Sequence, residues 1–204
     1  PDSQASEALE NLEPTEAARI LEELPSDAQA DLLADLEDED AEAILAQMEP
    51  EDAQDLRELA AYPEDTAGGL MITEMVQVVN GLSVDQVVDH FRKFSEEYSS
   101  YDVQYAYVVS DAGRLLGVLR LRDLLMAPGG DKVETIMLRD PHSVQIDAKL
   151  DELVHFFEEH HFFGAPVLNA DGVLCGVLRS SGVEAAVVDK SDETFRRTQG
   201  IVGG

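Results

Sequence analysis

Two stretches of the sequence, AYVVSDAGRLLGVLRLRDLL (residues 106–125) and APVLNADGVLCGVLRSSGVE (residues 165–184), repeat one pattern at an offset of 59 residues. Gly113 in the first copy aligns with Gly172 in the second. Each copy reads as an apolar strand, a hairpin turn with Asp and Gly, a second apolar strand and the start of a helix. The second half of the chain is therefore predicted to be an internal duplication.

An amphipathic helix is predicted in front of each hairpin, over SVDQVVDHFRKF (83–94) in the first copy and KLDELVHFFEEH (149–160) in the second. The first copy has about seven additional residues, EEYSSYD (96–102), between the helix and the hairpin. Each unit is therefore expected to have the order β–α–β–β–α. Two such units side by side are predicted to bury their sheets against one another.

The first part of the chain nearly repeats every 12 residues. Each row opens with Pro or acids and closes with apolar residues at helical spacing, which predicts one short helix per row. A Pro near the start of a row costs little, because the N–H that it removes has no partner in the first turn of a helix. Helices this short bury too little surface alone and are expected to stack. The rows are EPTEAARILEEL (13–24), PSDAQADLLADL (25–36), EDEDAEAILAQM (37–48) and EPEDAQDLRELA (49–60).

Negative charge is concentrated in this helical part. Residues 1–66 contain 22 acids and 2 bases, a net charge of −20, whereas residues 67–204 contain 21 acids and 12 bases, a net charge of −9. A surface this acidic repels nucleic acid and anionic lipid headgroups, so we expect no nucleic-acid partner, and it attracts cations. For any single acid, a solvated helix face or complementation of the helix dipole is an alternative to a metal role.

Other chemical signatures are few. The single Cys175 lies in an apolar run, which indicates a buried, inert thiol and a reducing compartment. No apolar run approaches the roughly 18 residues of a membrane span, and no signal peptide is visible. We interpret His155, His160 and His161 as surface or interface histidines, since no Cys or close acid completes a transition-metal set.

The duplicated half resembles a tandem pair of CBS domains (cystathionine β-synthase modules), with LMITEMVQVVNGLSVDQVV (70–88) and TIMLRDPHSVQIDAKLDELV (135–154) leading into the two copies. CBS pairs are regulatory modules that bind adenosine nucleotides or ions. With the acidic helices and the junction YPEDTAGGLM (62–71) in front, the chain resembles the cytosolic region of the MgtE magnesium transporter family. AGGLM is the most specific element of that resemblance.

The resemblance implies an α+β fold in which an all-helical, acidic superhelical domain precedes the CBS pair and a connecting helix follows it. It implies a homodimer formed through the CBS domains, and attachment to a transmembrane domain of the same protein on the cytoplasmic side of the inner membrane, with this part of the chain soluble. Gly68 and Gly69 are expected to give the junction the backbone freedom of a hinge. The implied domains are residues 1–66 (helical), 67–130 and 131–184 (CBS), and 185–204 (the start of the connecting, or plug, helix, which we place at about 182–200).

The family also implies a regulatory role for Mg²⁺. This ion prefers oxygen ligands and bridges carboxylates, so at high concentration it would dock the helical domain on the CBS pair, and the plug helix would hold the pore shut. At low concentration, repulsion between the acids would open the assembly. The residues that match the family's ion ligands are Asp27, Asp31, Gly69 (through its carbonyl), Asp189, Asp192 and Glu193. His161, Ser181 and Gly182 stand where the family has acids.

A nucleotide site is implied by one branch of the family that binds ATP. Tyr105, Arg122 and Asp123 match its stacking, phosphate and ribose contacts. CBS pairs commonly have a hydroxyl residue three positions before the Asp, where this chain has Arg120. The alternative is that Arg122 and Asp123 only begin a helix.

Two further classes of function compete with a magnesium-sensing domain. A stand-alone CBS adaptor could sense adenosine nucleotide and regulate a soluble partner. An enzyme is not expected, because the sequence has no Gly-rich phosphate loop, nucleophile–base pair or metal-ligand signature.

Overall fold

The computed structural model describes residues 2–101 and 104–202, which divide into two compact units that do not follow the order of the chain. The second CBS copy contributes to both units. The first unit comprises Pro1–Thr73, Asp147–Gly164 and Leu178–Gly204, and the second comprises Glu74–Ile146 and Ala165–Val177.

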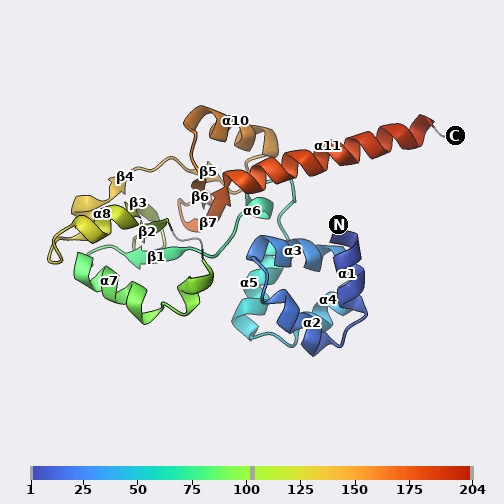
Figure 1. Cartoon of the computed structure of the whole chain (residues 1–204), viewed down its shortest axis with the longest axis horizontal. Helices are drawn as coiled ribbons and strands as arrows, with labels where there is room; N and C mark the ends of the chain where they lie inside the picture. The colour runs from blue at the N-terminus through green and yellow to red at the C-terminus, as the bar shows by residue number, and fades with distance from the viewer. Residues whose placement is uncertain (1, 102–103, 203–204) are drawn as a thin grey trace. The chain divides into compact units, whose positions relative to one another are not determined.

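Short helices follow one another in the helical segment that begins the first unit (Figure 1). Helices two apart in the chain pack together, α1 with α3, α2 with α4 and α3 with α5. This stacking buries the apolar positions of the repeat, and Leu21 and Leu45 are fully buried. The prediction of one helix per row is confirmed, and a further helix precedes the rows. The helices are α1 (Asp2–Glu10), α2 (Pro14–Leu21), α3 (Ser26–Asp35), α4 (Asp38–Leu45) and α5 (Pro50–Ala60).

The first CBS copy builds a sheet of order β1-β2-β3-β4 in the second unit, and its edge strand β4 comes from the segment that leads into the second copy. Strand β1 is parallel to β2, and β2–β3 and β3–β4 are antiparallel. The predicted order β–α–β–β–α is confirmed for this copy. The strands are β1 (Val76–Val79), β2 (Tyr105–Val109), β3 (Leu115–Arg120) and β4 (Leu138–Arg139). The helices are α7 (Val84–Lys93), the 3-10 helix η1 (Glu97–Ser100), α8 (Leu121–Met126) and α9 (Val133–Ile136).

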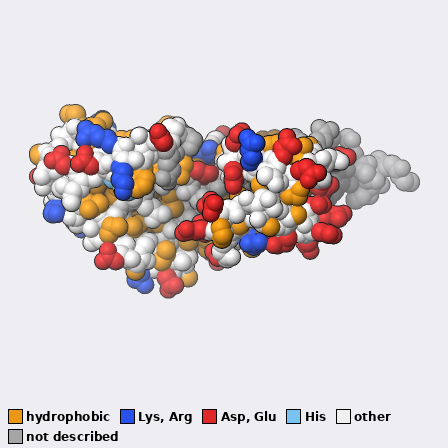
Figure 2. Space-filling model, turned by 90° about the horizontal axis from the view of Figure 1, so that it is seen from below, with side chains coloured by type: hydrophobic (Ala, Val, Ile, Leu, Met, Phe, Trp, Pro, Cys, Tyr) orange, Lys and Arg blue, Asp and Glu red, His pale blue; other side chains and the backbone are white. Residues whose placement is uncertain are grey.

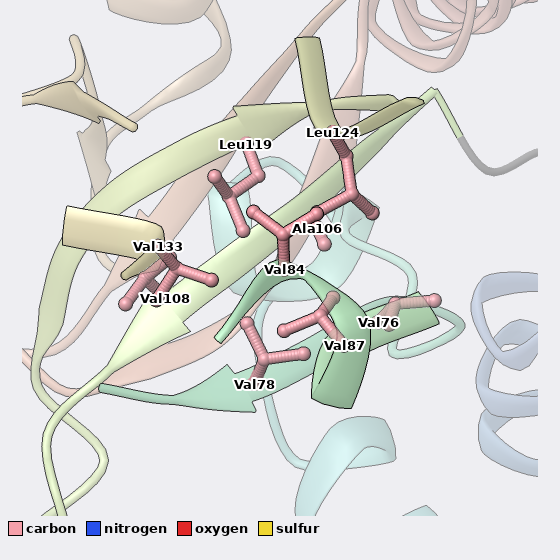
Figure 3. Close-up of a cluster of buried hydrophobic side chains, with 9 residues drawn as sticks. All are labelled: Val76, Val78, Val84, Val87, Ala106, Val108, Leu119, Leu124 and Val133. Atoms are coloured by element: carbon pink, nitrogen blue, oxygen red, sulfur yellow. The ribbon is translucent and has the colours of Figure 1, made fainter. Parts of the chain in front are cut away.

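A cluster of aliphatic side chains forms the core of this copy (Figure 3). Val84 and Val87 come from α7, and they meet Val76 and Val78 of β1 within the cluster. Helix α7 is fixed at its start by a capping box, in which the Ser83 hydroxyl accepts a bond from the Gln86 N–H and the Gln86 side chain accepts one from the Ser83 N–H. The core is completed by Ala106, Val108, Leu119, Leu124 and Val133.

The second CBS copy repeats these elements with a sheet of order β5-β6-β7. In the second unit the two hairpin turns bond to each other, because Leu115 N–H donates to Gly172 O at 3.1 Å and Leu174 N–H donates to Gly113 O at 3.0 Å. Both glycines have a positive φ, 73° and 77°, which favours Gly at the turn. The elements are β5 (Val144–Gln145), α10 (Leu150–His160), β6 (Gly164–Leu168), β7 (Leu174–Arg179) and α11 (Ser180–Val202).

The junction in front of the first CBS copy is a packed element of the first unit. Its short helix α6 (Ala67–Leu70) is capped by Thr66, whose hydroxyl accepts a bond from the Gly69 N–H, and Thr66, Ala67 and Gly69 are buried. A Cβ at Gly69 would collide with the Pro63 carbonyl oxygen. The expectation that Gly68 and Gly69 supply hinge freedom is therefore corrected, because both residues are helical and buried, and Gly69 permits a close backbone approach.

The same backbone bridge occurs once in each unit. Thr66 pairs with Lys149, with Ala67 N–H donating to Ala148 O and Leu150 N–H donating to Asp65 O, both at 2.9 Å. Ser83 and Lys132 are paired in the corresponding way in the second unit. The bridge thus joins the start of α6 to the start of α10, as the second bridge joins the start of α9 to the start of α7. The first residues of the first CBS segment are therefore attached to the second copy.

The connecting helix begins earlier than expected. Helix α11 starts at Ser180, directly after β7, and runs as one continuous element past the predicted domain boundary at residue 184. Its first turns pack with α6 and α10. Among the residues that the structure describes, none of the helices combines the length and apolarity needed to cross a bilayer.

The close approach at Gly69 generates a stability prediction. Gly69→Ala is expected to lower the free energy of unfolding by about 1–3 kcal/mol, because the Pro63–Glu64 backbone must move to admit the methyl group. Gly130→Ala is the control, since a Cβ there meets no atom within 4 Å. Chemical denaturation followed by circular dichroism measures both, and equal stabilities would contradict the packing role.

Candidate functional site

Asp27, one of the predicted ion ligands, is engaged in the first turn of α3. Its Oδ1 accepts a hydrogen bond from the Ala28 N–H at 2.9 Å, and its Oδ2 accepts one from Arg179 Nη2 at 3.0 Å. The two side chains are 22% and 38% exposed, which makes this ion pair less exposed than most others in the described part of the chain. The sequence did not suggest Arg179 as a functional residue.

A second contact fixes the same end of α3. Ser26 is buried, and its hydroxyl accepts a hydrogen bond from the Thr73 N–H at 2.9 Å. Asp31 lies one turn further along α3 and is exposed. The start of α3 is therefore held by both Thr73 and Arg179, which lie far from it in the sequence.

The predicted ligand Gly69 lies on α6, which packs with α3, α5 and α11. The structure thus brings Asp27, Asp31 and Gly69 onto neighbouring elements of the first unit. Asp189 is exposed on α11. The side chains of Asp192 and Glu193 lie outside the described part of the structure.

The described residues do not form a ready-made metal site. Among the residues whose side chains the structure describes, which exclude Asp192 and Glu193, no group of at least three His, Cys, Asp or Glu side chains is placed to hold an ion. The positions of Ser181 and Gly182 offer no carboxylate, and His161 is an exposed C-cap of α10 with φ 52°. The available chemistry is an excess of carboxylates on separate elements, which fits Mg²⁺ held by one or two acids and water.

The histidines lie around the end of α10. The His160 ring stacks on Phe162 with ring centroids 5.4 Å apart, and His155 lies 4.0 Å from the Glu159 carboxylate one turn away. His155 and His161 are exposed. These contacts place the three histidines in aromatic and surface environments.

The predicted nucleotide residues lie at the start of β2 and in the first turn of α8. Tyr105 on β2 is paired in register with Arg120, and Arg120 Nε donates to Asp123 Oδ2 at 2.5 Å. Asp123 is 24% exposed, whereas Arg122 is 86% exposed and lies 3.9 Å from it. Arg120 therefore lies opposite Tyr105 in the sheet and bonds to Asp123, whereas Arg122 projects into solvent.

Arg120 and Arg179 are the two functional candidates that sequence reasoning missed. They occupy equivalent positions, at the ends of β3 and β7. The signal for Arg120 was its spacing of three residues from Asp123. No comparable signal exists for Arg179, because its partner Asp27 is 152 residues away.

Acidic side chains crowd the visible face of the helical segment, which lies in the right half of Figure 2, with few basic side chains among them. Arg19 and Arg57 are the bases of residues 1–66. Arg57 Nη2 lies 2.7 Å from Glu42 Oε2, and this hydrogen bond lowers the pKa of the Glu42 carboxyl. Most acids of the segment therefore face solvent without a basic neighbour in their own segment.

Comparison with known protein families supports a division of the chain at the junction. Residues 1–65 match the MgtE intracellular N domain, and residues 67–130 and 133–192 match the CBS domain. A magnesium transporter MgtE of Thermus thermophilus is 36% identical over 124 residues, which is 61% of this chain and 27% of that protein. The chain thus spans about a quarter to a third of the length of the curated relatives that it matches.

Solved structures give the same result. The cytosolic domain of the Mg²⁺ channel MgtE in complex with ATP is 32% identical, covers 91% of this chain and 80% of its own, and superposes with a TM-score of 0.75. The soluble part of a magnesium transporter, 23% identical, has the same fold with a TM-score of 0.79 over 93% of this chain and 78% of its own. The chain, with an MgtE intracellular N domain ahead of two CBS domains, therefore belongs to the MgtE family.

Proposed function

We propose that this chain is the Mg²⁺-sensing regulatory region of a magnesium transporter or channel. The observation that carries the proposal is the 32% identity to the cytosolic domain of a Mg²⁺ channel across 91% of the chain. The net charge of −20 in residues 1–66 supports it, because a segment with so many acids and two bases requires cations to approach another acidic surface.

The mechanism is a shift between two arrangements. In the closed arrangement the start of α3 contacts Thr73 and the β7–α11 corner, as in this structure. In the open arrangement the helical segment separates, driven by repulsion among its carboxylates. Bound Mg²⁺ supplies positive charge and bridges carboxylate oxygens, which favours the closed arrangement.

Specific residues have roles in this proposal. Asp27 and Asp31 present carboxylates from α3, and Gly69 presents a carbonyl from α6. On α11, the acids Asp189, Asp192 and Glu193 contribute charge where the chain leads out of the CBS pair. Helix α11 transmits the state to a transmembrane part, because it is continuous from the corner that α3 contacts.

We also propose that the first CBS copy binds ATP. Tyr105 lies opposite Arg120 in the sheet, and Arg120 bonds to Asp123. These residues would supply an aromatic ring, a positive charge and a carboxylate for a ribose. The exposed Arg122 can turn toward the phosphates. This arrangement also supports the alternative of an adaptor that senses adenosine nucleotide for a soluble partner. Neither alternative is an enzyme, since no nucleophile or general base is part of either site.

The proposed assembly is a homodimer through the CBS copies. Large apolar side chains are exposed at the end of α8 (Leu125 and Met126), after α10 (Phe163) and on α11 (Val188). Exposed apolar side chains of this size commonly mark interfaces. A transmembrane part of the same protein is the second proposed partner.

The dimer predicts a measured mass twice that of the 22.3 kDa chain. Sedimentation equilibrium at micromolar protein is expected to give this dimer mass, and Leu125→Glu with Met126→Glu is expected to favour the monomer because burying charge opposes association. Ile20→Glu, at an exposed position on α2, is the control. A wild-type monomer at every concentration would contradict the assembly.

The sensor mechanism predicts that millimolar Mg²⁺ makes the chain more compact. Small-angle scattering across a Mg²⁺ titration is expected to show a falling radius of gyration, with a smaller effect of KCl at equal ionic strength, because screening cannot bridge carboxylates. An ion at 100 times its dissociation constant adds roughly 2.7 kcal/mol to the state that alone binds it, which is enough to close an evenly balanced equilibrium.

The titration has a matched pair of variants. Asp31→Asn, on α3, is expected to raise the Mg²⁺ midpoint, whereas Asp52→Asn, on the exposed first turn of α5, removes the same charge elsewhere and is expected to change it less. A constant radius of gyration for the wild type throughout the titration would refute the sensor mechanism for this chain.

The nucleotide site predicts that Asp123→Ala weakens ATP binding by roughly tenfold to a hundredfold, the effect of removing a hydrogen bond to a charged group. Asp111→Ala is the control, since Asp111 is an exposed turn residue of the same copy. Isothermal titration calorimetry measures both affinities. An equal loss of ATP affinity in the two variants would contradict a nucleotide site at Asp123.

A further inference from the structure

The two equivalent arginines of the CBS copies have different partners. Arg120, at the end of β3, pairs with Asp123 three residues later in the first turn of α8. Arg179, at the end of β7, has Gly182 at the position that corresponds to Asp123. The second copy therefore retains the arginine of the first copy but lacks the carboxylate three residues after it.

Arg179 instead pairs with Asp27, the residue on α3 that the family resemblance names as an ion ligand. The guanidinium lies 3.0 Å from Asp27 Oδ2, while Asp27 Oδ1 accepts the Ala28 N–H at 2.9 Å. Both carboxylate oxygens therefore already have donors. The guanidinium therefore supplies positive charge at Asp27 Oδ2, at the contact between α3 and the end of β7.

A second ion pair joins the end of the acidic helical segment to the second CBS copy. Lys149 Nζ lies 3.1 Å from Asp65 Oδ1, beside the backbone bridge between Thr66 and Lys149. Both side chains are about half exposed, so this pair contributes less than a buried one. Two ion pairs thus join the acidic N-terminal segment to the second CBS copy, one at the end of β7 and one at the start of α10.

We propose that Arg179 is an internal counter-ion that holds the start of α3 on the β7–α11 corner without a divalent ion. The contact is available because Gly182 leaves the arginine without its local acid. One consequence rests on the proposed function. The closed arrangement is already populated in metal-free solution, so Mg²⁺ shifts the open–closed equilibrium less in this chain than in a chain that closes through bridging ions alone.

Amide hydrogen exchange of Thr73 reports on this contact directly, because its N–H is bonded to Ser26 Oγ beside Asp27. In metal-free buffer containing EDTA, Arg179→Gln is expected to speed exchange of the Thr73 amide by roughly threefold to tenfold. Arg57→Gln is the matched control, since it removes an ion pair with Glu42 within the helical segment and is expected to leave Thr73 unchanged.

Gly182→Asp provides a test that keeps the arginine. The introduced carboxylate restores the local partner found in the first copy, so it competes for Arg179 and is expected to speed Thr73 exchange in metal-free buffer. An exchange of charges, Asp27→Arg with Arg179→Asp, is expected to restore slow exchange relative to either single variant. Circular dichroism confirms that each variant retains its helices.

The outcomes separate this inference from the proposed function. Faster Thr73 exchange in Arg179→Gln and Gly182→Asp supports the counter-ion, even if Mg²⁺ has no effect on the wild type and the sensor mechanism fails. Unchanged exchange in both variants overturns the counter-ion. Unchanged metal-free exchange combined with a lower Mg²⁺ midpoint in Arg179→Gln also overturns it, because the arginine would then only compete with Mg²⁺ for Asp27, and the sensor mechanism would stand.

Discussion

The backbone bridge between Thr66 and Lys149 is the constraint on which the arrangement of the first unit depends. Its hydrogen bonds connect residues 65–67, at the end of the acidic helices, to residues 148–150, at the start of α10. More than eighty residues close a loop between the two strands of the bridge. Closing this loop costs conformational entropy, although the cost rises only slowly with loop length. Burial of Thr66, Ala67 and Gly69 around the bridge offsets that cost.

The bridge explains why the junction is a packed element and why it has small residues. Its counterpart in the other copy, between Ser83 and Lys132, precedes α9 in the way that the Thr66 bridge precedes α6. A segment that completes a CBS copy must be packed, and α6 is packed against α3, α5 and α11.

Charge decides which contacts form once the backbone has placed these elements. The acidic segment has too few bases to neutralise itself, so its attachments depend on positive charge from elsewhere in the chain or from solution. Asp27 and Asp65 are each met by a base of the second CBS copy. The loss of one local acid at Gly182 changes Arg179 from a residue that stabilises its own helix start into one that joins distant segments.

The sequence by itself determined the short stacked helices, the duplicated β–α–β–β–α units and the turn glycines, because these follow from local periodicity and from φ values that only nearby residues dictate. The sequence also predicted a site at Tyr105 and Asp123, two residues of one copy in which Tyr105 is paired with Arg120 and Arg120 bonds to Asp123. Only the tertiary structure decided that Gly69 is a packing residue, that α11 is continuous from Ser180, and that Asp27 meets Arg179. Each of these depends on partners brought together by folding, and the 152 residues between Asp27 and Arg179 leave no periodic trace from which their contact could be predicted.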